Sequence, residues 1–279
     1  MSERSGFPPV PDLVLPHPVV DNHCHLDIAR DGAALPVEEA LARAASVGVT
    51  RFVQVGCDLP SARWAVEASA EHPQMIAAVA LHPNDAPLHG ADLEAALDEI
   101  ERLATAHDRV RAVGETGLDF FRTGPDGVAA QTHSFRRHVE IAKRHDKTLQ
   151  IHDRDAHDAV LEVLDSEGAP DRWVMHCFSG DADFARACLD RGAYLSFAGT
   201  VTFKNAADLR EALAVAPRDR ILVETDAPFL TPAPHRGRLN SPYLIPHTLQ
   251  VMAEVRGADL GTLCAQIDRN TEAAFGGAW

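Results

Sequence analysis

Two histidines at the end of the first short apolar run could bind a metal ion. The run is followed by His23-Cys24-His25, and because side chains alternate along a strand, both histidines are predicted to point to one side and Cys24 to the other. Imidazole is a preferred ligand of zinc and other transition metals. A single histidine is more often a packed core or surface residue, but this pair at a strand end indicates a metal site.

Four more residues with metal-binding side chains end later apolar runs. They are Glu115, His152, His176 and Asp226. Burying so many ionisable groups at one rim is costly unless their charge is compensated, and divalent cations compensate it directly. Three carboxylate or imidazole ligands per ion, with one carboxylate shared, suit two divalent cations, for which zinc, manganese and magnesium are the candidates.

Short apolar runs alternate with longer segments of helical spacing, a pattern typical of parallel strands covered by helices. The predicted strands are Pro18–Asn22, Arg51–Gly56, Met75–Leu81, Val110–Glu115, Thr148–His152, Arg172–His176, Ala193–Phe197 and Ile221–Asp226. Helices are predicted after them, most clearly at Val37–Val47, Ser61–Ala70, Ala91–Ala106, Val128–His145, Asp155–Leu164 and Asp181–Arg191. Eight such units predict a TIM-type (β/α)8 barrel, in which residues at the carboxyl ends of the strands share one face.

The length of 279 residues and the apolar content of 46% fit a single barrel domain over residues 1–279, which includes an N-terminal extension at residues 1–17. The glycine-rich patterns of nucleotide-binding sheets are absent, which argues against a doubly wound fold. Two segments rich in proline and glycine, Thr123–Gly127 and Ala227–Pro242, are predicted to form loops over the catalytic face.

The net charge of −15 repels polyanions, so a nucleic-acid substrate would be held locally and transiently by bound cations and a few arginines. Five cysteines without a C-x-x-C pair favour neither a disulfide framework nor a zinc ribbon, and a reducing cytoplasm is the predicted compartment. No secretory signal or membrane-spanning run is found in the sequence. We therefore expect a cytoplasmic monomer with no membrane partner.

Seven short motifs together resemble one known family. They are D-N-H-C-H-L-D at Asp21–Asp27, L-H-P at Leu81–Pro83, G-E-T-G-L-D-F at Gly114–Phe120, I-H-D-R-D-A at Ile151–Ala156, H-C-F-S-G at His176–Gly180, E-T-D-A-P at Glu224–Pro228 and R-G-R-L-N-S-P at Arg236–Pro242. In content and order they resemble the TatD family of metal-dependent deoxyribonucleases, within the amidohydrolase-like barrel group. The resemblance extends over nearly the whole chain.

The resemblance implies an assignment of the six ligands. One cation is held by His23, His25 and Asp226, the other is held by His152 and His176, and Glu115 bridges the two. The family's last motif usually reads R-G-K-R-N-E-P, whereas this chain has Leu239 and Ser241 in place of one basic and one acidic residue. This difference leaves every ligand in place but weakens detailed predictions of how the last loop binds substrate.

The predicted reaction is hydrolysis of a DNA or nucleotide phosphodiester. Two cations lower the pKa of a bridging water, so that hydroxide is available near neutral pH. Asp226 is predicted to orient or deprotonate this water, and the bridging Glu115 is the second catalytic carboxylate. Substrate binding is predicted for five rim residues, each with the alternative of an ordinary packed or solvated side chain: His82, Arg122, Arg154, Arg236 and Arg238.

Several neighbouring residues receive more modest roles. Ser179 is expected to cap the following helix, because F-S-G-D lacks the G-x-S-x-G turn of a nucleophilic serine. Asp119 is a candidate partner that orients a ligand histidine. His138 falls in a helical pattern and is expected at the surface.

Two other functions remain open at this point. The same barrel could cleave an amide, a lactone or an aminoacyl ester, because a metal-activated hydroxide also attacks carbonyl carbon. A barrel that binds a partner or nucleic acid without catalysis is less favoured, because all six ligand-type residues are present.

Overall fold

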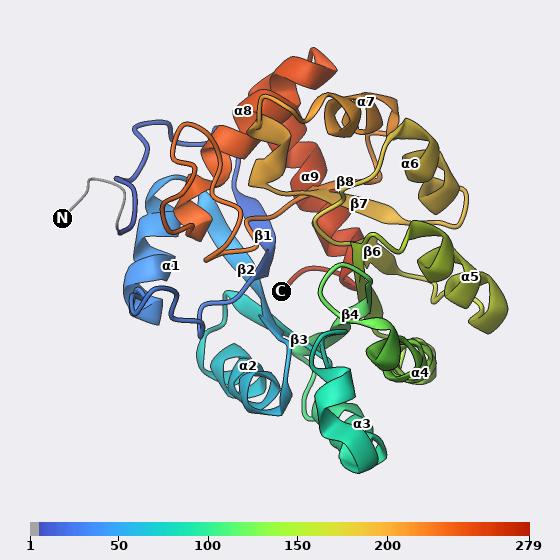
Figure 1. The fold of residues 1–279 in the computed structure, drawn as a ribbon. Coiled ribbons are helices and arrows are strands. Elements are labelled where there is room, and N and C mark those ends of the chain that lie inside the picture. Colours follow the sequence, from blue (N-terminus) through green and yellow to red (C-terminus); the bar gives the residue numbers. More distant parts are fainter. Residues whose placement is uncertain (1–5) are drawn as a thin grey trace. The chain divides into compact units, whose positions relative to one another are not determined.

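The computed structural model describes residues 6–279, in which strands alternate with helices (Figure 1). The strands form one eight-stranded sheet in sequence order. They are β1 (Val19–Cys24), β2 (Val49–Gly56), β3 (Met75–Val79), β4 (Val110–Asp119), β5 (Thr148–Arg154), β6 (Trp173–Met175), β7 (Tyr194–Phe197) and β8 (Ile221–Val223). The helices are α1 (Val37–Ser46), α2 (Leu59–Glu71), α3 (Leu93–Ala104), α4 (Pro125–Arg144), α5 (His157–Glu167), α6 (Ala182–Leu189), α7 (Ala207–Val215), α8 (Ile245–Arg256) and α9 (Leu260–Ala274), with 3-10 helices η1 (Ala86–Asp92), η2 (Gly199–Thr202) and η3 (Pro242–Leu244).

The first strand pairs with the segment that follows the last strand. Cys24 forms a parallel bridge with Ala227. The N–H of Asp226 donates to the carbonyl of His23 at 2.9 Å, and the N–H of His25 donates to the carbonyl of Ala227 at 2.8 Å. Together with the strand order, this closure confirms the predicted TIM-type (β/α)8 barrel.

The described chain divides into two compact units. The first comprises residues 6–53, 180–186 and 195–271, and the second comprises Gln54–Ser179, Ala187–Tyr194 and Glu272–Trp279. In the second unit, strands β3 to β6 pair in parallel; α3 packs against β3 and β4, and α4 packs against β4 and β5 (Figure 1). The assignment of residues 1–279 to one domain stays a prediction.

The proline-rich amino-terminal segment packs within the first unit. Of the predicted extension at residues 1–17, residues 1–5 lie outside the described part of the chain. Leu15 is buried, and its N–H donates to the carbonyl of Val47 at 2.9 Å. The hydroxyl of Tyr243 donates to the carbonyl of Pro8 at 2.6 Å. The described part of the extension therefore contributes to the packing of this unit.

At the starts of α2 and α6, side chains satisfy free N–H groups of the first turn. At α2, the Asp58 carboxylate accepts from the N–H of Ser61 at 2.8 Å, and the Ser61 hydroxyl accepts from the N–H of Asp58 at 3.1 Å. At α6, Asp181 accepts from two following N–H groups at 2.9 and 3.0 Å. The expectation that Ser179 caps α6 is therefore wrong, because the carboxylate of Asp181 lies closer to the helix start. Among the described helices, none combines the length and apolar character needed to cross a bilayer.

Strand β4 is longer than predicted. It continues past Glu115 to Asp119, and it pairs in parallel with β5, with Asp119 opposite Arg154. The apolar run predicts an end at Glu115, whereas Gly117 and the polar residue at position 119 also belong to the strand. Glu115 therefore lies inside a strand, where its position is fixed more firmly than at a loop edge.

His138 is buried in the second unit, contrary to the expected surface position. It is fully buried on the inner face of α4. Its Nε2 accepts from the N–H of Leu81 at 3.3 Å, so the proton is on Nδ1, which lies 2.9 Å from the Thr116 hydroxyl. Burial lowers the pKa of His138 to about 3. The neutral ring thus joins α4 to the strand that carries Glu115.

This buried histidine predicts acid sensitivity of the fold. Its pKa in the folded state lies below the value of about 6.5 expected in the unfolded chain, so its contribution to stability is present above pH 6.5 and is lost as pH falls toward 3. Between pH 7.5 and 4.5, the wild type should lose roughly 2–3 kcal/mol more free energy of unfolding than His138→Gln. Urea unfolding at several pH values measures this difference.

The matched control is His133→Gln, which changes an exposed histidine on the same helix. It should retain the wild-type dependence of stability on pH. Parallel curves for the wild type and His138→Gln would show that His138 is not kept neutral by the fold.

Candidate metal centre

The histidine pair of β1 has the predicted alternation. The Cys24 thiol is buried on one side of the strand and donates to the carbonyl of Val53 at 3.6 Å. His23 and His25 are buried on the other side, with their Nε2 atoms 3.2 Å apart. The two imidazoles therefore present converging nitrogens, as sequence alternation predicted.

Asp226 completes a cluster of three donor atoms in the first unit. Its Oδ1 lies 3.3 Å from His25 Nε2 and 3.9 Å from His23 Nε2. Two ligands of a tetrahedral ion, each about 2.1 Å from the metal, are about 3.4 Å apart. The three separations thus fit a shared divalent cation. The Asp226 side chain is 15% exposed, which makes it the member of this cluster most open to solvent.

The turn that carries Asp226 is held by Asp21, a buried carboxylate that sequence analysis did not single out. Asp21 accepts from the N–H of Thr225 at 2.9 Å and from its hydroxyl at 2.5 Å. Asp226 follows with a φ of 55°, in the left-handed region. These bonds explain why β8 ends at Val223, before its predicted end at Asp226. Burial raises the pKa of Asp21 to about 7, although the bonds from Thr225 oppose this rise.

A second cluster lies in the second unit around the buried carboxylate of Glu115. Its Oε1 is 2.5 Å from His152 Nδ1 and 3.2 Å from His176 Nε2. Its Oε2 is 3.6 Å from the Sγ of Cys57, a contact that the sequence did not predict. Glu115, His152 and His176, all predicted ligands, are therefore brought together around one carboxylate.

Glycine 117 allows β4 and β5 to approach closely at this cluster. Gly117 lies opposite His152 in the strand pairing, and its φ is 140°. A Cβ at this position would overlap the carbonyl oxygen of His152. The G-E-T-G motif therefore supplies the carboxylate of Glu115 and also the space in which the strand of His152 can lie.

Two further residues adjoin this cluster in the second unit. His82 Nδ1 accepts from the N–H of Asn84 at 3.0 Å, so the proton of the neutral ring is on Nε2, which lies 3.6 Å from Glu115 Oε1. Asp119 Oδ2 lies 3.4 Å from His152 Nε2, on the ring nitrogen that faces away from Glu115. His82 is thus oriented as a hydrogen-bond donor, and Asp119 has the position of a carboxylate that orients a ligand histidine.

The side chains of the second cluster shift one another's pKa values in opposite directions. Burial raises the pKa of Glu115, but its electrostatic interactions with His176 and His82 and the hydrogen bond to His152 outweigh burial and hold this pKa well below its usual value. Burial lowers the pKa of His152, but Asp119 and Glu115 outweigh burial and raise it to about 9. A cation that binds His152 must displace a proton from its imidazole, so the affinity of the cation should increase with pH.

Comparison with known proteins identifies the family. The sequence model described as TatD related DNase matches residues 20–276. The chain belongs to this family. A relative from Mycobacterium tuberculosis, named uncharacterized metal-dependent hydrolase TatD, is 46% identical over 265 residues, which cover 94% of this chain and 99% of the relative. Membership places the chain among metal-dependent hydrolases and confirms the resemblance found in its motifs.

Two other members of the TatD family are informative. A protein from Citrobacter rodentium named 3'-5' ssDNA/RNA exonuclease TatD is 35% identical, with coverage of 86% of this chain and 91% of the relative. The crystal structure of YjjV, a TatD homologue from Escherichia coli K12, superposes with a TM-score of 0.86 at 26% identity and covers 93% of this chain and 98% of its own. The barrel fold of this chain is therefore the fold of its family.

Two of the four predicted substrate-binding arginines lie in the second unit. Arg122 is exposed, and its backbone N–H donates to Asp119 Oδ1 at 2.8 Å. The guanidinium of Arg154 lies 3.9 Å from the centre of the Phe121 ring. The contact between Arg154 and Phe121 depends on how the ends of β4 and β5 are placed, so the sequence alone does not predict it.

The other two arginines lie in the first unit, in the last motif of the family. Arg236 is exposed, and its guanidinium lies 3.9 Å from the centre of the Phe203 ring. Arg238 donates to the backbone carbonyls of residues 6 and 7, at 3.4 and 2.5 Å. Arg238 therefore ties the last loop to the amino-terminal segment, whereas Arg236 is directed to solvent.

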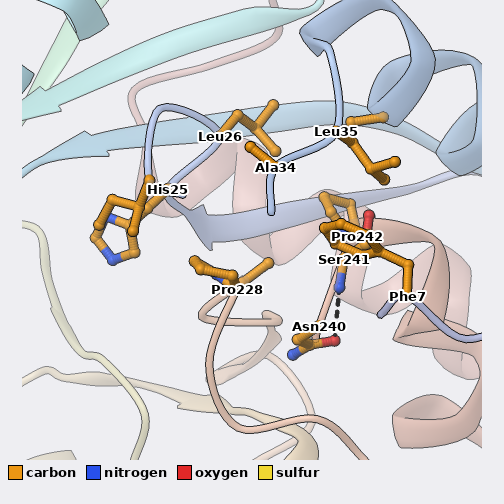
Figure 2. A pocket seen from close by; sticks show the side chains of 12 residues that line it. Phe7, His25, Leu26, Ala34, Leu35, Pro228, Asn240, Ser241 and Pro242 are labelled. Carbon is orange, nitrogen blue, oxygen red and sulfur yellow. Dashed lines mark hydrogen bonds between the residues drawn. The ribbon is translucent and has the colours of Figure 1, made fainter. Parts of the chain in front are cut away.

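The positions at which this chain departs from the family motif face the interior of the first unit. Figure 2 shows Ser241 in the wall of a pocket that also adjoins His25. The cavity is about 20 Å³, close to the space of one water molecule, and its walls are mainly apolar. Leu239 and Ser241 are buried, and the Ser241 hydroxyl has no hydrogen-bond partner among the described residues. Both side chains are therefore packed in the interior and are not presented to solvent, and Ser241 lines the pocket that adjoins His25.

Proposed function

We propose that this chain is a metal-dependent deoxyribonuclease that hydrolyses DNA phosphodiester bonds. The observation that carries the proposal is the presence, in each unit, of two histidines whose ring nitrogens lie within 3.9 Å of an oxygen of one carboxylate, Asp226 in the first unit and Glu115 in the second. The exonuclease name of the Citrobacter relative supports a nucleic-acid substrate.

The two clusters provide the ligands for two cations. His23, His25 and Asp226 would hold one, and His152 and His176 would hold the other, with Glu115 as the shared ligand. Imidazole and carboxylate ligands fit zinc and manganese well and accept magnesium less readily. When bound, such cations act as Lewis acids and make water easier to deprotonate near neutral pH.

The chain's own residues complete the reaction. The Asp226 side chain is 15% exposed, so water can reach its carboxylate, which accepts the proton of the attacking water. The Nε2–H of His82 donates to a phosphoryl oxygen and stabilises the charge that develops there. The exposed Arg122 and Arg236 are suited to fork onto neighbouring phosphates. No protein nucleophile is needed.

The charge of the chain supports brief contact with its substrate. A net charge of −15 repels DNA over most of the surface, so binding is confined to the cations and the arginines nearby. The cysteine pattern of the sequence, five residues without a C-x-x-C pair, supports the predicted cytoplasmic compartment. We propose a monomer as the working form.

The test is a substrate panel with the chelated wild-type protein. Zinc, manganese and magnesium are restored one at a time, and cleavage of labelled single-stranded DNA is measured beside an amide, a lactone and an aminoacyl ester. The expected result is DNA cleavage that is absent after chelation and returns with at least one metal. Cleavage of the carbonyl substrates alone by the metal-loaded protein would overturn the nuclease proposal.

A further inference from the structure

Two consecutive aromatic residues at the end of β4 are exposed. Phe120 is 38% exposed and Phe121 is 63% exposed. They follow Asp119, the last residue of the strand that carries Glu115. Large apolar side chains at a surface often mark a binding site when they lie next to functional groups. These two rings therefore require an explanation that core packing does not provide.

Phe121 already stacks with a cation. The Arg154 guanidinium lies 3.9 Å from the centre of its ring, a distance typical of a cation–π contact. A backbone hydrogen bond holds the two segments together at this contact, because the N–H of Phe120 donates to the carbonyl of Arg154 at 2.9 Å. Since Arg154 lies over the ring and more than half of Phe121 stays exposed, the ring retains a surface on which another planar group can stack.

The turn that carries Phe121 is fixed by the carboxylate beside His152. Asp119 Oδ1 accepts from the N–H of Phe121 at 3.0 Å and from that of Arg122 at 2.8 Å. Its Oδ2 accepts from the Asn84 amide at 2.9 Å and lies 3.4 Å from His152 Nε2. The aromatic ring is therefore tied, through one side chain, to a candidate metal ligand.

The same strand also places Arg154 near that ligand. His152 and Arg154 are two residues apart in β5, so their Cα atoms are about 7 Å apart and their side chains leave the strand on the same side. A phosphate near His152 and a planar group on Phe121 would thus belong to neighbouring parts of one substrate. A nucleotide, which joins a phosphate to an aromatic base, has this combination.

We propose that Phe121 and Arg154 form a stacking platform for an unpaired nucleobase next to the scissile phosphate. The inference rests on the proposed nuclease function and names its substrate more closely. A base inside a duplex has its faces covered by neighbouring bases, whereas a base in a single strand or at a frayed end can stack on a protein ring. The platform therefore selects single-stranded DNA.

The experiment compares two strands with the same phosphates. One is an oligothymidylate, and the other is its abasic analogue with tetrahydrofuran units and no bases. The readout is the ratio of kcat/KM for the two strands, measured with metal-loaded wild type, Phe121→Leu and Phe121→Trp. Phe121→Leu keeps an apolar side chain without a ring and should lower this ratio about 5- to 150-fold, as expected for ~1–3 kcal/mol per stacked base. Phe121→Trp should restore it.

Trp279→Leu is the matched control. Trp279 also lies against an arginine, with the Arg111 guanidinium 5.6 Å from its ring centre, and Arg111 is at the amino end of β4. This change should leave the ratio at the wild-type value. Because both strands are tested on one preparation, partial unfolding changes both rates and leaves the ratio unaffected.

The outcomes separate the platform from the nuclease function. A wild type that cleaves neither strand overturns both proposals. A wild type that cleaves both strands equally well, or a Phe121→Leu variant with an unchanged ratio, overturns the platform and leaves the nuclease function standing. Failure of Phe121→Trp to restore the ratio would also overturn it, because the indole ring provides an equivalent stacking surface.

Discussion

Replacing His152 and His176 together by alanine should lower metal-dependent hydrolysis by at least about a thousandfold, because metal ions contribute several kcal/mol to such reactions and each 1.36 kcal/mol is a factor of ten in rate. Both imidazoles approach the same oxygen of Glu115, at 2.5 and 3.2 Å. The double change therefore removes two of the three nitrogen and oxygen donors of the second cluster. The measurements are kcat/KM for the panel substrate that the wild type cleaves and the number of bound metal ions per chain.

The control for this experiment is a second pair of neighbouring histidines. The rings of His235 and His247 are 5.3 Å apart, and neither residue belongs to a donor cluster. The double variant His235→Ala/His247→Ala should retain its bound metal and most of its activity. If His152→Ala/His176→Ala kept full activity and full metal content, the second cluster would not be a metal site.

The first cluster was largely predictable because its geometry is local. His23 and His25 are two residues apart, and the alternation of a strand is sufficient to bring their side chains to one side. The addition of Asp226 required only that β1 and the segment after β8 be neighbours, which follows from closing a barrel of eight consecutive units. The left-handed conformation of Asp226 and its support by Asp21 are tertiary features, and the apolar pattern contains no sign of them.

The second cluster was predicted in composition but not in detail. The apolar run that predicts β4 stops near Glu115, yet backbone pairing with β5 carries the strand on to Asp119. An apolar pattern predicts a strand from the residues that are buried. Polar residues with a functional role interrupt this pattern even where the strand continues through them. The strand therefore ended too early in the sequence-based prediction.

The burial of His138 could have been found in the sequence. Gln131, Ser134, Phe135, His138 and Ala142 recur at the spacing of one helix face, and all of them are buried. Three of these residues, Gln131, Ser134 and His138, are polar, so a search for apolar residues at helical spacing does not identify this face as buried. Phe121 shows the opposite limit, because a phenylalanine after a strand predicts burial and only the tertiary structure shows that this side chain is 63% exposed.

Changing Asp226 to asparagine should separate proton transfer from metal binding. Asparagine has the same shape, and it tolerates the left-handed φ of 55° that this position requires. The amide cannot accept the proton of the attacking water, and general base catalysis typically contributes about 10²–10⁴-fold to the rate. We therefore expect kcat at saturating metal to fall by about this factor while the variant still binds metal, although more weakly.

Asp31→Asn is the matched control, because Asp31 has a φ of 53° but is 84% exposed and lies outside the donor cluster. It should leave kcat and metal content unchanged. Metal analysis must accompany the kinetics, because Asp226 is proposed both as a ligand and as the proton acceptor. A variant Asp226→Asn with bound metal and a wild-type kcat would remove Asp226 from the role of base, and the proton would then have to go to another group or to solvent. A variant that regains kcat only as metal is added would assign Asp226 to the ligand role alone.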